Sequence, residues 1–162
     1  MKGPLTHRAF RLRANMEHSQ AKQLLRKSRV EVAPETFYLV SLRHDDWQKL
    51  LGNPALSPRM TAPFMILMEK KEVTLLLDET DFGTMRHALP DAKTEGGYRL
   101  LTFDIELDLN VVGFMAEVSQ ILAKANIPIM ALSAFSRDHV LIKQDDLANA
   151  LEALGEHVAD LC

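Results

Sequence analysis

The sequence contains few of the residues on which cross-links and metal binding usually depend. Its single cysteine, Cys162, is the last residue, which excludes an internal disulfide and a cysteine-based zinc site. No apolar run approaches the length of a membrane span, and no signal-peptide core lies near the N-terminus. We therefore expect a protein of a reducing compartment, the cytoplasm, with no membrane partner.

The sequence also lacks the short motifs of common enzyme classes. It has no phosphate-binding loop, no dinucleotide-binding glycine pattern, no serine-hydrolase elbow and no zinc-protease helix motif. The six histidines are scattered and form no helical pair suited to a metal ion. We expect a protein that is not an enzyme and that uses no catalytic residue, no metal and no cofactor.

Positive charge is concentrated at the start of the chain. Residues 1–30 hold eight Lys or Arg against one Glu, whereas the remaining residues hold 11 basic and 21 acidic side chains. The acidic body argues against nucleic acid as its partner. An RNA-binding sheet is also disfavoured, because the exposed strand face carries Asp104 and Glu106 rather than basic and aromatic residues.

Residues 1–33 are predicted to form a basic N-terminal extension that is loosely ordered, as charged termini usually are. The alternatives are an arm that binds nucleic acid or an anionic membrane, and a transit peptide; Met16 is an alternative start. The helix candidate in this stretch, residues 16–27, has only three apolar residues on one face, which is too few for firm docking. These residues are Ala21, Leu24 and Leu25.

Two hydrophobic periods meet in the region that organises the chain, residues 98–144. Every second residue is apolar over 101–107, which predicts a strand with one buried face. After Gly113 the apolar residues recur at spacings of three and four up to Ala125. This spacing predicts a helix, which Pro128 prevents from continuing.

The same region continues with two strands and a second helix. Residues 127–135 read as a strand buried on both faces, and residues 139–142 as the next strand after a short polar break. Four apolar residues at helical spacing then predict a helix from Leu147 to Val158. The order β-α-β-β-α supplies five of the six elements of a ferredoxin-like βαββαβ unit, an α+β fold.

Four segments of this region, residues 109–116, 122–129, 133–142 and 145–151, carry a family resemblance. They resemble an ACT domain, a small-molecule-binding regulatory module, and in detail the CASTOR-type family of tandem ACT proteins. The animal members of that family sense arginine, and its bacterial members are small stand-alone proteins. The resemblance implies a ligand between the strand–helix loop and the neighbouring strands, usually at a junction of two units.

Residues 34–97 are predicted to form a first, shortened ACT-like unit, and residues 98–162 the second ACT domain. Residues 78–97 read as a polar connector in which Gly96 and Gly97 act as breakers. A strand, a helix and the two strands of a hairpin are expected at 36–42, 44–51, 64–69 and 73–77.

The number of strands suggests that the two halves depend on each other. Six strands are evident, whereas two complete βαββαβ units need eight. The last helix leaves no room for a closing strand before Cys162. An open sheet edge is a liability. We therefore expect the halves to share or exchange strands, or an early segment such as Arg29–Ala33 to fill the vacant edge.

The start of the helix after Gly113 is the candidate receptor for a ligand carboxylate. A helix N-terminus presents free backbone N–H groups and a partial positive charge. Asn110, Val111, Val112 and Gly113 are expected to bind the carboxylate, chiefly through their backbone N–H groups. The glycine also lets a ligand or a second backbone approach closely.

The other end of an amino acid, its ammonium group, needs an anion and further acceptors. Asp138 and Ser133 are the candidates, and Ile129, Ala134 and Phe135 are expected to shape the wall of the site. An alternative is that Asp138 bonds only within its own turn. A second alternative is that the neighbouring Arg137 pairs with Asp138 and weakens its attraction for an ammonium group.

These residues predict a non-catalytic regulatory protein that binds a free amino acid or a similar small zwitterion. The expected partners are the amino acid effector and either a second copy of the chain in a homodimer or a regulated partner protein. The alternative function is a protein–protein interaction module, active in dimerisation, whose pocket is vestigial. A third is a nucleic-acid or membrane adaptor that acts through residues 1–30.

Overall fold

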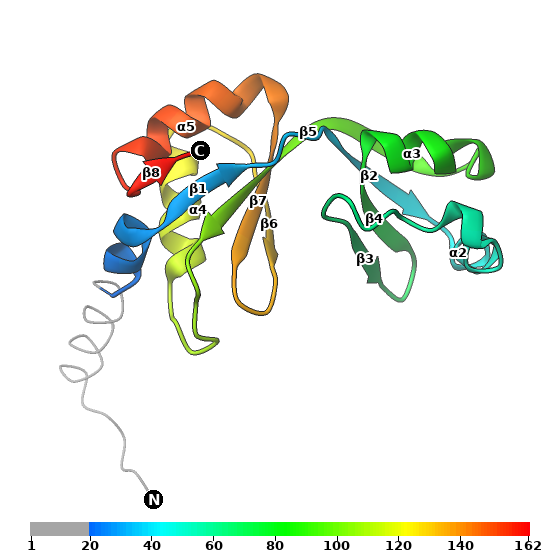
Figure 1. The fold of residues 1–162 in the computed structure, drawn as a ribbon, viewed down its shortest axis with the longest axis horizontal. Coiled ribbons are helices and arrows are strands. Elements are labelled where there is room, and N and C mark those ends of the chain that lie inside the picture. Colours follow the sequence, from blue (N-terminus) through cyan, green and yellow to red (C-terminus); the bar gives the residue numbers. More distant parts are fainter. Residues whose placement is uncertain (1–19) are drawn as a thin grey trace, which may run out of the picture. The chain divides into compact units, whose positions relative to one another are not determined.

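The structure is a computed structural model of the chain, and it describes residues 20–162. The predictions of a binding arm, a transit peptide and a start at Met16 concern residues that lie largely outside this range. The described chain forms two compact units (Figure 1). The first unit comprises residues 33–100. The second unit comprises residues 20–32 together with residues 101–162. Our predicted boundaries had fallen after residues 33 and 97.

The first unit contains all six elements of a βαββαβ fold. Its sheet has the strand order β3-β4-β2-β5, to which β5 contributes its first half. The predicted helix and hairpin are confirmed, but the predicted connector was wrong, because residues 78–97 contain a helix and the start of a strand. The elements are β2 (Phe37–Leu42), α2 (His44–Leu51), η1 (Pro54–Leu56), β3 (Met65–Met68), β4 (Val73–Asp78), α3 (Glu79–Met85), η2 (Arg86–Ala88) and β5 (Lys93–Asp104).

The two glycines that we read as breakers lie inside β5. A Cβ atom at Gly96 would collide with the ring of Tyr38 on the neighbouring strand β2. Gly97 has a φ of 73°, a left-handed conformation that glycine adopts without steric cost. The register of β2 against β5 shifts opposite these glycines, between Phe37 and Leu39. The glycines therefore let the strand pass a large side chain through a bulge and do not end it.

The second unit repeats the βαββαβ order and adds one strand. β5 pairs with β7, and β7 pairs with the edge strand β6. On its other side β5 pairs with β1, which in turn pairs with β8. The elements are β1 (Arg29–Val32), β5 as above, α4 (Phe114–Lys124), β6 (Met130–Ser133), β7 (Asp138–Lys143), η3 (Gln144–Asp146), α5 (Leu147–Gly155) and β8 (Asp160–Leu161).

Strand sharing is confirmed, because β5 is the last strand of the first unit and the first strand of the second. The early segment predicted as a spare strand forms β1. The expectation of no closing strand was wrong, since β8 needs only two residues. The Val32 N–H donates to the Cys162 carbonyl over 3.0 Å, and the Cys162 N–H donates to the Val30 carbonyl over 2.8 Å.

The helical residues 20–27 pack into the core of the second unit. Ala21 is fully buried. Leu25 is 2% exposed and belongs to the same cluster as Val118, Leu122 and Leu154. The expectation that this segment docks weakly was therefore wrong over the described residues. A narrow apolar face suffices here because small and branched side chains fit against a close-packed core.

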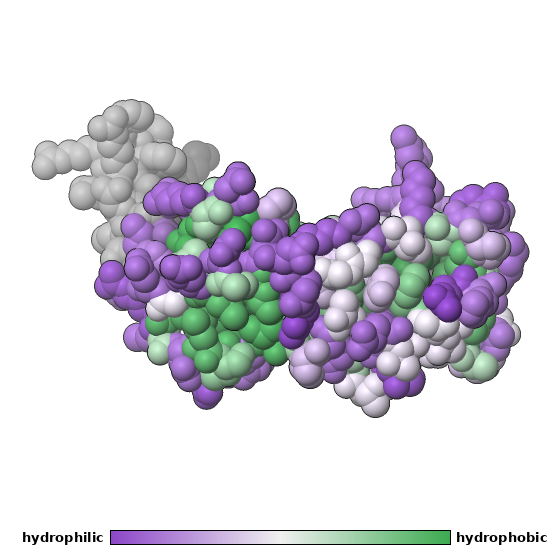
Figure 2. Space-filling model, turned by 90° about the horizontal axis from the view of Figure 1, so that it is seen from above, coloured by the Kyte–Doolittle hydropathy of each residue, from purple (hydrophilic) through white to green (hydrophobic). Residues whose placement is uncertain are grey.

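The predicted double burial of residues 127–135 was also wrong. β6 pairs with β7, and three of its four residues are exposed, including Met130. Large hydrophobic side chains are exposed elsewhere too, notably Met68 on β3 and Phe135 after β6. Figure 2 shows hydrophobic side chains gathered on one face of the second unit (left), with hydrophilic side chains around them. Such areas are candidate contact surfaces.

Candidate functional site

A cavity of about 370 Å³ lies within the second unit, between the start of α4 and the turn that joins β6 to β7. The loop from β5 to α4 forms its third side. Its volume lies at the lower end of the range for small-molecule sites. The lining residues are Leu107, Asp108, Leu109, Val111, Gly113, Phe114, Met115, Ala116 and residues 133–138.

Gly113 and the first three residues of α4 line this cavity. Gly113 is the N-cap, with a φ of 88° and a ψ of 5°, and no side chain caps the helix there. Among residues 20–162, a Cβ atom at this position would meet the Ala21 side chain alone, at 3.8 Å. The glycine is therefore needed for its backbone conformation rather than to admit a neighbour. The uncapped first turn places a partial positive charge at the cavity.

The turn before the helix uses two of the N–H groups that we had assigned to a ligand. The Asn110 N–H and side-chain amide both donate to Oδ1 of Asp108 over 2.8 Å. The Val111 N–H donates to the Asp108 carbonyl over 2.9 Å. The hydrogen bonds from Asn110 lower the pKa of Asp108. This turn is therefore an Asx-type turn that uses these N–H groups within itself.

The opposite side of the cavity carries a carboxylate. Ser133 and Asp138 are paired residues of β6 and β7, and Ser133 Oγ donates to Asp138 Oδ1 over 2.6 Å. The turn between the two strands closes with the Ala134 N–H donating to the Arg137 carbonyl over 2.9 Å. A carboxylate accepts several hydrogen bonds, so the bond from Ser133 orients Asp138 and leaves it capacity for a ligand.

Arg137 is engaged by a residue far away in the sequence. Its Nε donates to Oδ1 of Asp104, at the end of β5, over 2.9 Å. The Leu107 N–H donates to the Ser136 carbonyl over 2.9 Å and ties the same turn to the loop before α4. The alternative in which Arg137 pairs with Asp138 is thus not the arrangement of this structure.

Six of the nine predicted site residues line the common cavity: Val111, Gly113, Ser133, Ala134, Phe135 and Asp138. Phe135 is 82% exposed at the tip of the turn. Three lie elsewhere. Ile129 packs against the core, Val112 points to solvent, and Asn110 lines a shallower depression beside the loop.

Sequence reasoning missed the first three residues of α4, Phe114 to Ala116, as part of the cavity. The available signal was Gly113 itself. In a helix whose N-cap is known, the N–H groups that lack an intrahelical partner are those of the residues that follow the cap. Identifying the glycine as the cap would have moved the predicted contact by one turn.

His139 follows Asp138 on β7 and is half-buried. Its Nδ1 lies 3.0 Å from Thr102 Oγ1, which indicates a hydrogen bond. Burial lowers its pKa, opposed by the charge of Asp138 and reinforced by that of Arg137. Among residues 20–162 we find no group of side chains suited to a metal ion and no helix long and apolar enough to cross a membrane.

With this geometry established, the chain was compared with known proteins. Residues 93–156 match a family model described as ACT domain. The chain contains an ACT domain. The match runs from β5 to the last turn of α5, so the ACT domain includes both sides of the cavity. No match was found among curated proteins.

Solved structures resemble the chain over most of its length. A protein from Agrobacterium tumefaciens is 16% identical, with a TM-score of 0.66 over 84% of this chain and 92% of its own. A protein from Vibrio cholerae is 21% identical, with a TM-score of 0.63 over 87% and 98%. The ligand-free regulatory subunit of aspartate kinase from Thermus thermophilus is 14% identical, with a TM-score of 0.61 over 82% and 98%. At these identities the similarity concerns the fold.

Proposed function

We propose that the ACT domain binds a free amino acid in the cavity between α4 and the β6–β7 turn and that binding regulates a partner protein. One observation carries the proposal. The uncapped, positively polarised start of α4 and the carboxylate of Asp138 line the same small cavity. A free amino acid has a carboxylate group that suits the start of α4 and an ammonium group that suits Asp138.

The ligand carboxylate is placed at the first turn of α4 rather than at residues 110–112. The N–H groups of Asn110 and Val111 already donate within the preceding turn. Those of Phe114, Met115 and Ala116 follow an N-cap without a capping side chain. A carboxylate at a helix N-terminus gains both hydrogen bonds and the favourable helix dipole.

The ligand ammonium is placed at Asp138. Ser133 holds this carboxylate by a hydrogen bond, and Arg137, the nearest cation in sequence, is occupied by Asp104. Asp138 therefore lines the cavity without competition from Arg137. Charge-assisted hydrogen bonds contribute about 1.5–3 kcal/mol each, so a few of them give micromolar to millimolar affinity after the costs of binding.

The regulatory role rests on the ACT domain and on the likeness to a regulatory subunit of aspartate kinase rather than to a catalytic domain. We propose accordingly that the protein is not itself an enzyme, that it works in the cytoplasm, and that it signals to a second copy or to a partner protein. Two ACT-like units that share β5 support a place among tandem ACT proteins of the CASTOR type.

The direct test is a thermal-shift screen of the full chain against the twenty amino acids, followed by isothermal titration of any hit. A ligand at a hundred times its dissociation constant stabilises the protein by about 2.7 kcal/mol, which is several degrees in melting temperature. Asp138→Asn should weaken binding about tenfold or more, because it removes a charge-assisted contact.

The matched control is Asp145→Asn. Asp145 is an exposed carboxylate of η3 in the same unit and does not line the cavity. The Asp145→Asn substitution should leave the affinity for the amino acid unchanged. A screen with no selective shift at millimolar concentrations, or an equal loss of affinity in both variants, would refute the proposal.

A further inference from the structure

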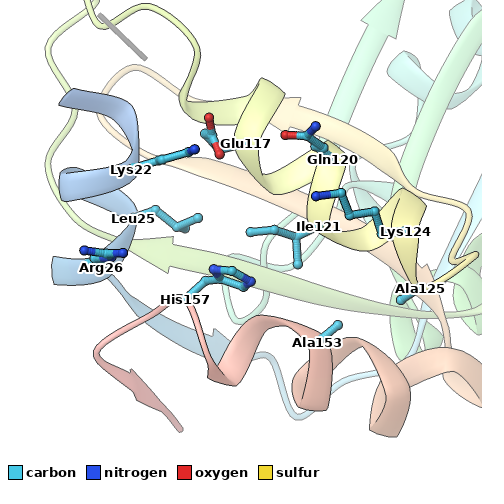
Figure 3. Close-up of a pocket in the computed structure, with 10 residues that line it drawn as sticks. All are labelled: Lys22, Leu25, Arg26, Glu117, Gln120, Ile121, Lys124, Ala125, Ala153 and His157. Carbon is cyan, nitrogen blue, oxygen red and sulfur yellow. The ribbon is translucent and has the colours of Figure 1, made fainter. Parts of the chain in front are cut away.

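A second cavity, of about 410 Å³, lies in the second unit on the side covered by helices. It is bounded by the helical residues 20–27, by α4 and by the end of α5 (Figure 3). Its lining shares no residue with the cavity assigned to the amino acid. It is therefore a separate candidate site, and the argument for it does not depend on the function proposed above.

Cationic side chains from two separate elements surround this cavity. Lys22 and Arg26 come from the helical residues 20–27, and Lys124 comes from the last turn of α4. Among the described residues that line it, the only carboxylate is that of Glu117. Like charges gathered around one space repel each other, and an anion placed among them relieves the repulsion.

Glu117 does not cancel this charge. It is 5% exposed, near the start of α4, and Figure 3 shows the Lys22 side chain pointing toward it. The described lining residues thus include three cations and one carboxylate. Gln120 and His157 add polar groups at the same rim, so the cavity offers several hydrogen-bond donors beside the net positive charge.

The floor of the cavity is apolar. Figure 3 shows Leu25 and Ile121 pointing toward each other between the helices, with Ala153 below them. Leu25 belongs to the hydrophobic core of the unit. Leu25 is itself buried, so the apolar surface open to a ligand is that of Ile121 and Ala153, which are partly exposed. A bare inorganic ion would leave this surface exposed to water, whereas a ligand with an apolar part covers it.

We propose that this cavity binds a small organic anion, with a phosphate or carboxylate head held by Lys22, Arg26 and Lys124 and an apolar part against Ile121 and Ala153. α4 lines both cavities. Its first turn faces the amino acid site, and its residues from Glu117 to Lys124 face the anion site. The protein thus has one helix through which two ligands can influence each other.

The test is a titration of the isotopically labelled full chain, followed by NMR. Phenyl phosphate and benzoate are the two anionic probes, and benzyl alcohol is the neutral probe of similar shape. We expect saturable shifts of the backbone signals of residues 22–26 and 117–125 with an anionic probe and none with benzyl alcohol. Comparing the two anions distinguishes a phosphate head from a carboxylate head.

Lys22→Gln and Lys124→Gln should each weaken the binding of the anionic probe with the higher affinity about fivefold, as expected for partly exposed ion pairs. Lys27→Gln is the matched control, because Lys27 is exposed on the same helical segment but does not line the cavity. Equal weakening by all three variants would mean general charge attraction and overturn the proposal. So would equal binding of benzyl alcohol, or shifts that do not saturate.

Discussion

The two units share a βαββαβ order but differ at the junction between their first strand and first helix. In the first unit, β2 ends at Leu42 and α2 begins at His44, so Arg43 alone joins them. In the second unit, residues 105–113 separate β5 from α4. This loop forms one side of the candidate amino acid site. The corresponding part of the first unit has no loop from which to build one.

The start of α2 is also occupied by groups of its own unit. His44 Nε2 lies 2.7 Å from the Glu69 carbonyl, at the β3–β4 turn. Asp46, in the first turn, accepts hydrogen bonds from Lys49 and Arg43, which lower its pKa. In the second unit the equivalent gap between helix and hairpin is the cavity. The same fold thus leaves a cavity at this place or fills it with its own side chains, according to the length of the junction loop and the groups at the first turn of the helix.

The largest effect is expected from the core of the second unit. Phe103 is fully buried and contacts Phe114 edge-on, with ring centroids 5.6 Å apart. Phe103→Ala should lower the free energy of unfolding by about 3–5 kcal/mol. The sole tryptophan, Trp47, lies in the first unit and reports on that unit in a urea titration. If the shared strand β5 couples the units, the Trp47 transition should move as well.

If the Trp47 transition is unchanged in Phe103→Ala, the two units unfold independently of each other, and the shared strand does not couple their stabilities. Phe135→Ala serves as the control, because Phe135 is exposed and lies outside the core. It should change the stability by less than about 0.5 kcal/mol.

A medium effect is expected where α3 of the first unit begins. The Asp78 side chain accepts from the Asp81 N–H over 2.7 Å, and it also accepts from Arg59. Asp78→Ala should lower the free energy of unfolding by about 1–2 kcal/mol through loss of the helix cap. Chemical denaturation measures the change, and Glu79→Ala is the control, because its exposed side chain caps nothing. Equal losses in both variants would contradict the capping role.

A smaller effect is expected where α4 of the second unit begins with a glycine. In Gly113→Ala the alanine must adopt a left-handed conformation, which costs about 1–2 kcal/mol. Part of this cost is offset because alanine lowers the conformational entropy of the unfolded chain. We expect a net loss of about 1 kcal/mol in a thermal melt. Gly83→Ala in α3 should have the opposite sign and stabilise by about 0.5–1 kcal/mol, because it lies in open space within a helix. A stabilising Gly113→Ala would contradict the assigned conformation.

The smallest effect concerns pH. Burial lowers the pKa of His139 below its ordinary value of 6.5, so the folded state favours the neutral ring. Stability from this group is complete above pH 6.5 and is lost as the pH falls below it, since the unfolded chain then binds the proton more readily. His139→Gln should reduce the fall in the urea midpoint between pH 7 and pH 5.5. His87→Gln in the first unit is the control, and an equal reduction there would contradict the assignment.

Much of the fold could be predicted from the sequence, because amphipathic periods are local. The helix at 44–51 and the strands of both hairpins follow from such patterns. β8 could not be predicted, because two residues carry no period and pair only with the distant β1. The first half of β5 could not be predicted, because Gly96 reads as a strand breaker in the sequence. A glycine is needed there because the ring of Tyr38, on another strand, leaves no room for a Cβ atom.

The site was predictable in part for the same reason. A glycine before a helix and an acidic residue in a hairpin turn are visible in the sequence, and the structure brings Gly113 and Asp138 to one cavity. The partner of Arg137 was not visible, because Asp104 lies on another strand. The use of the Asn110 N–H within its own turn depends on a side-chain orientation that composition does not fix.

The most direct test of the central claim is an NMR titration of the labelled chain with the amino acid that gives the largest thermal shift. The account predicts saturable changes at residues 113–116 and 133–138 of the second unit, with residues 44–47 and 69–72 of the first unit unchanged. Changes centred on the first unit, or no saturable change at millimolar concentrations of any amino acid, would contradict it.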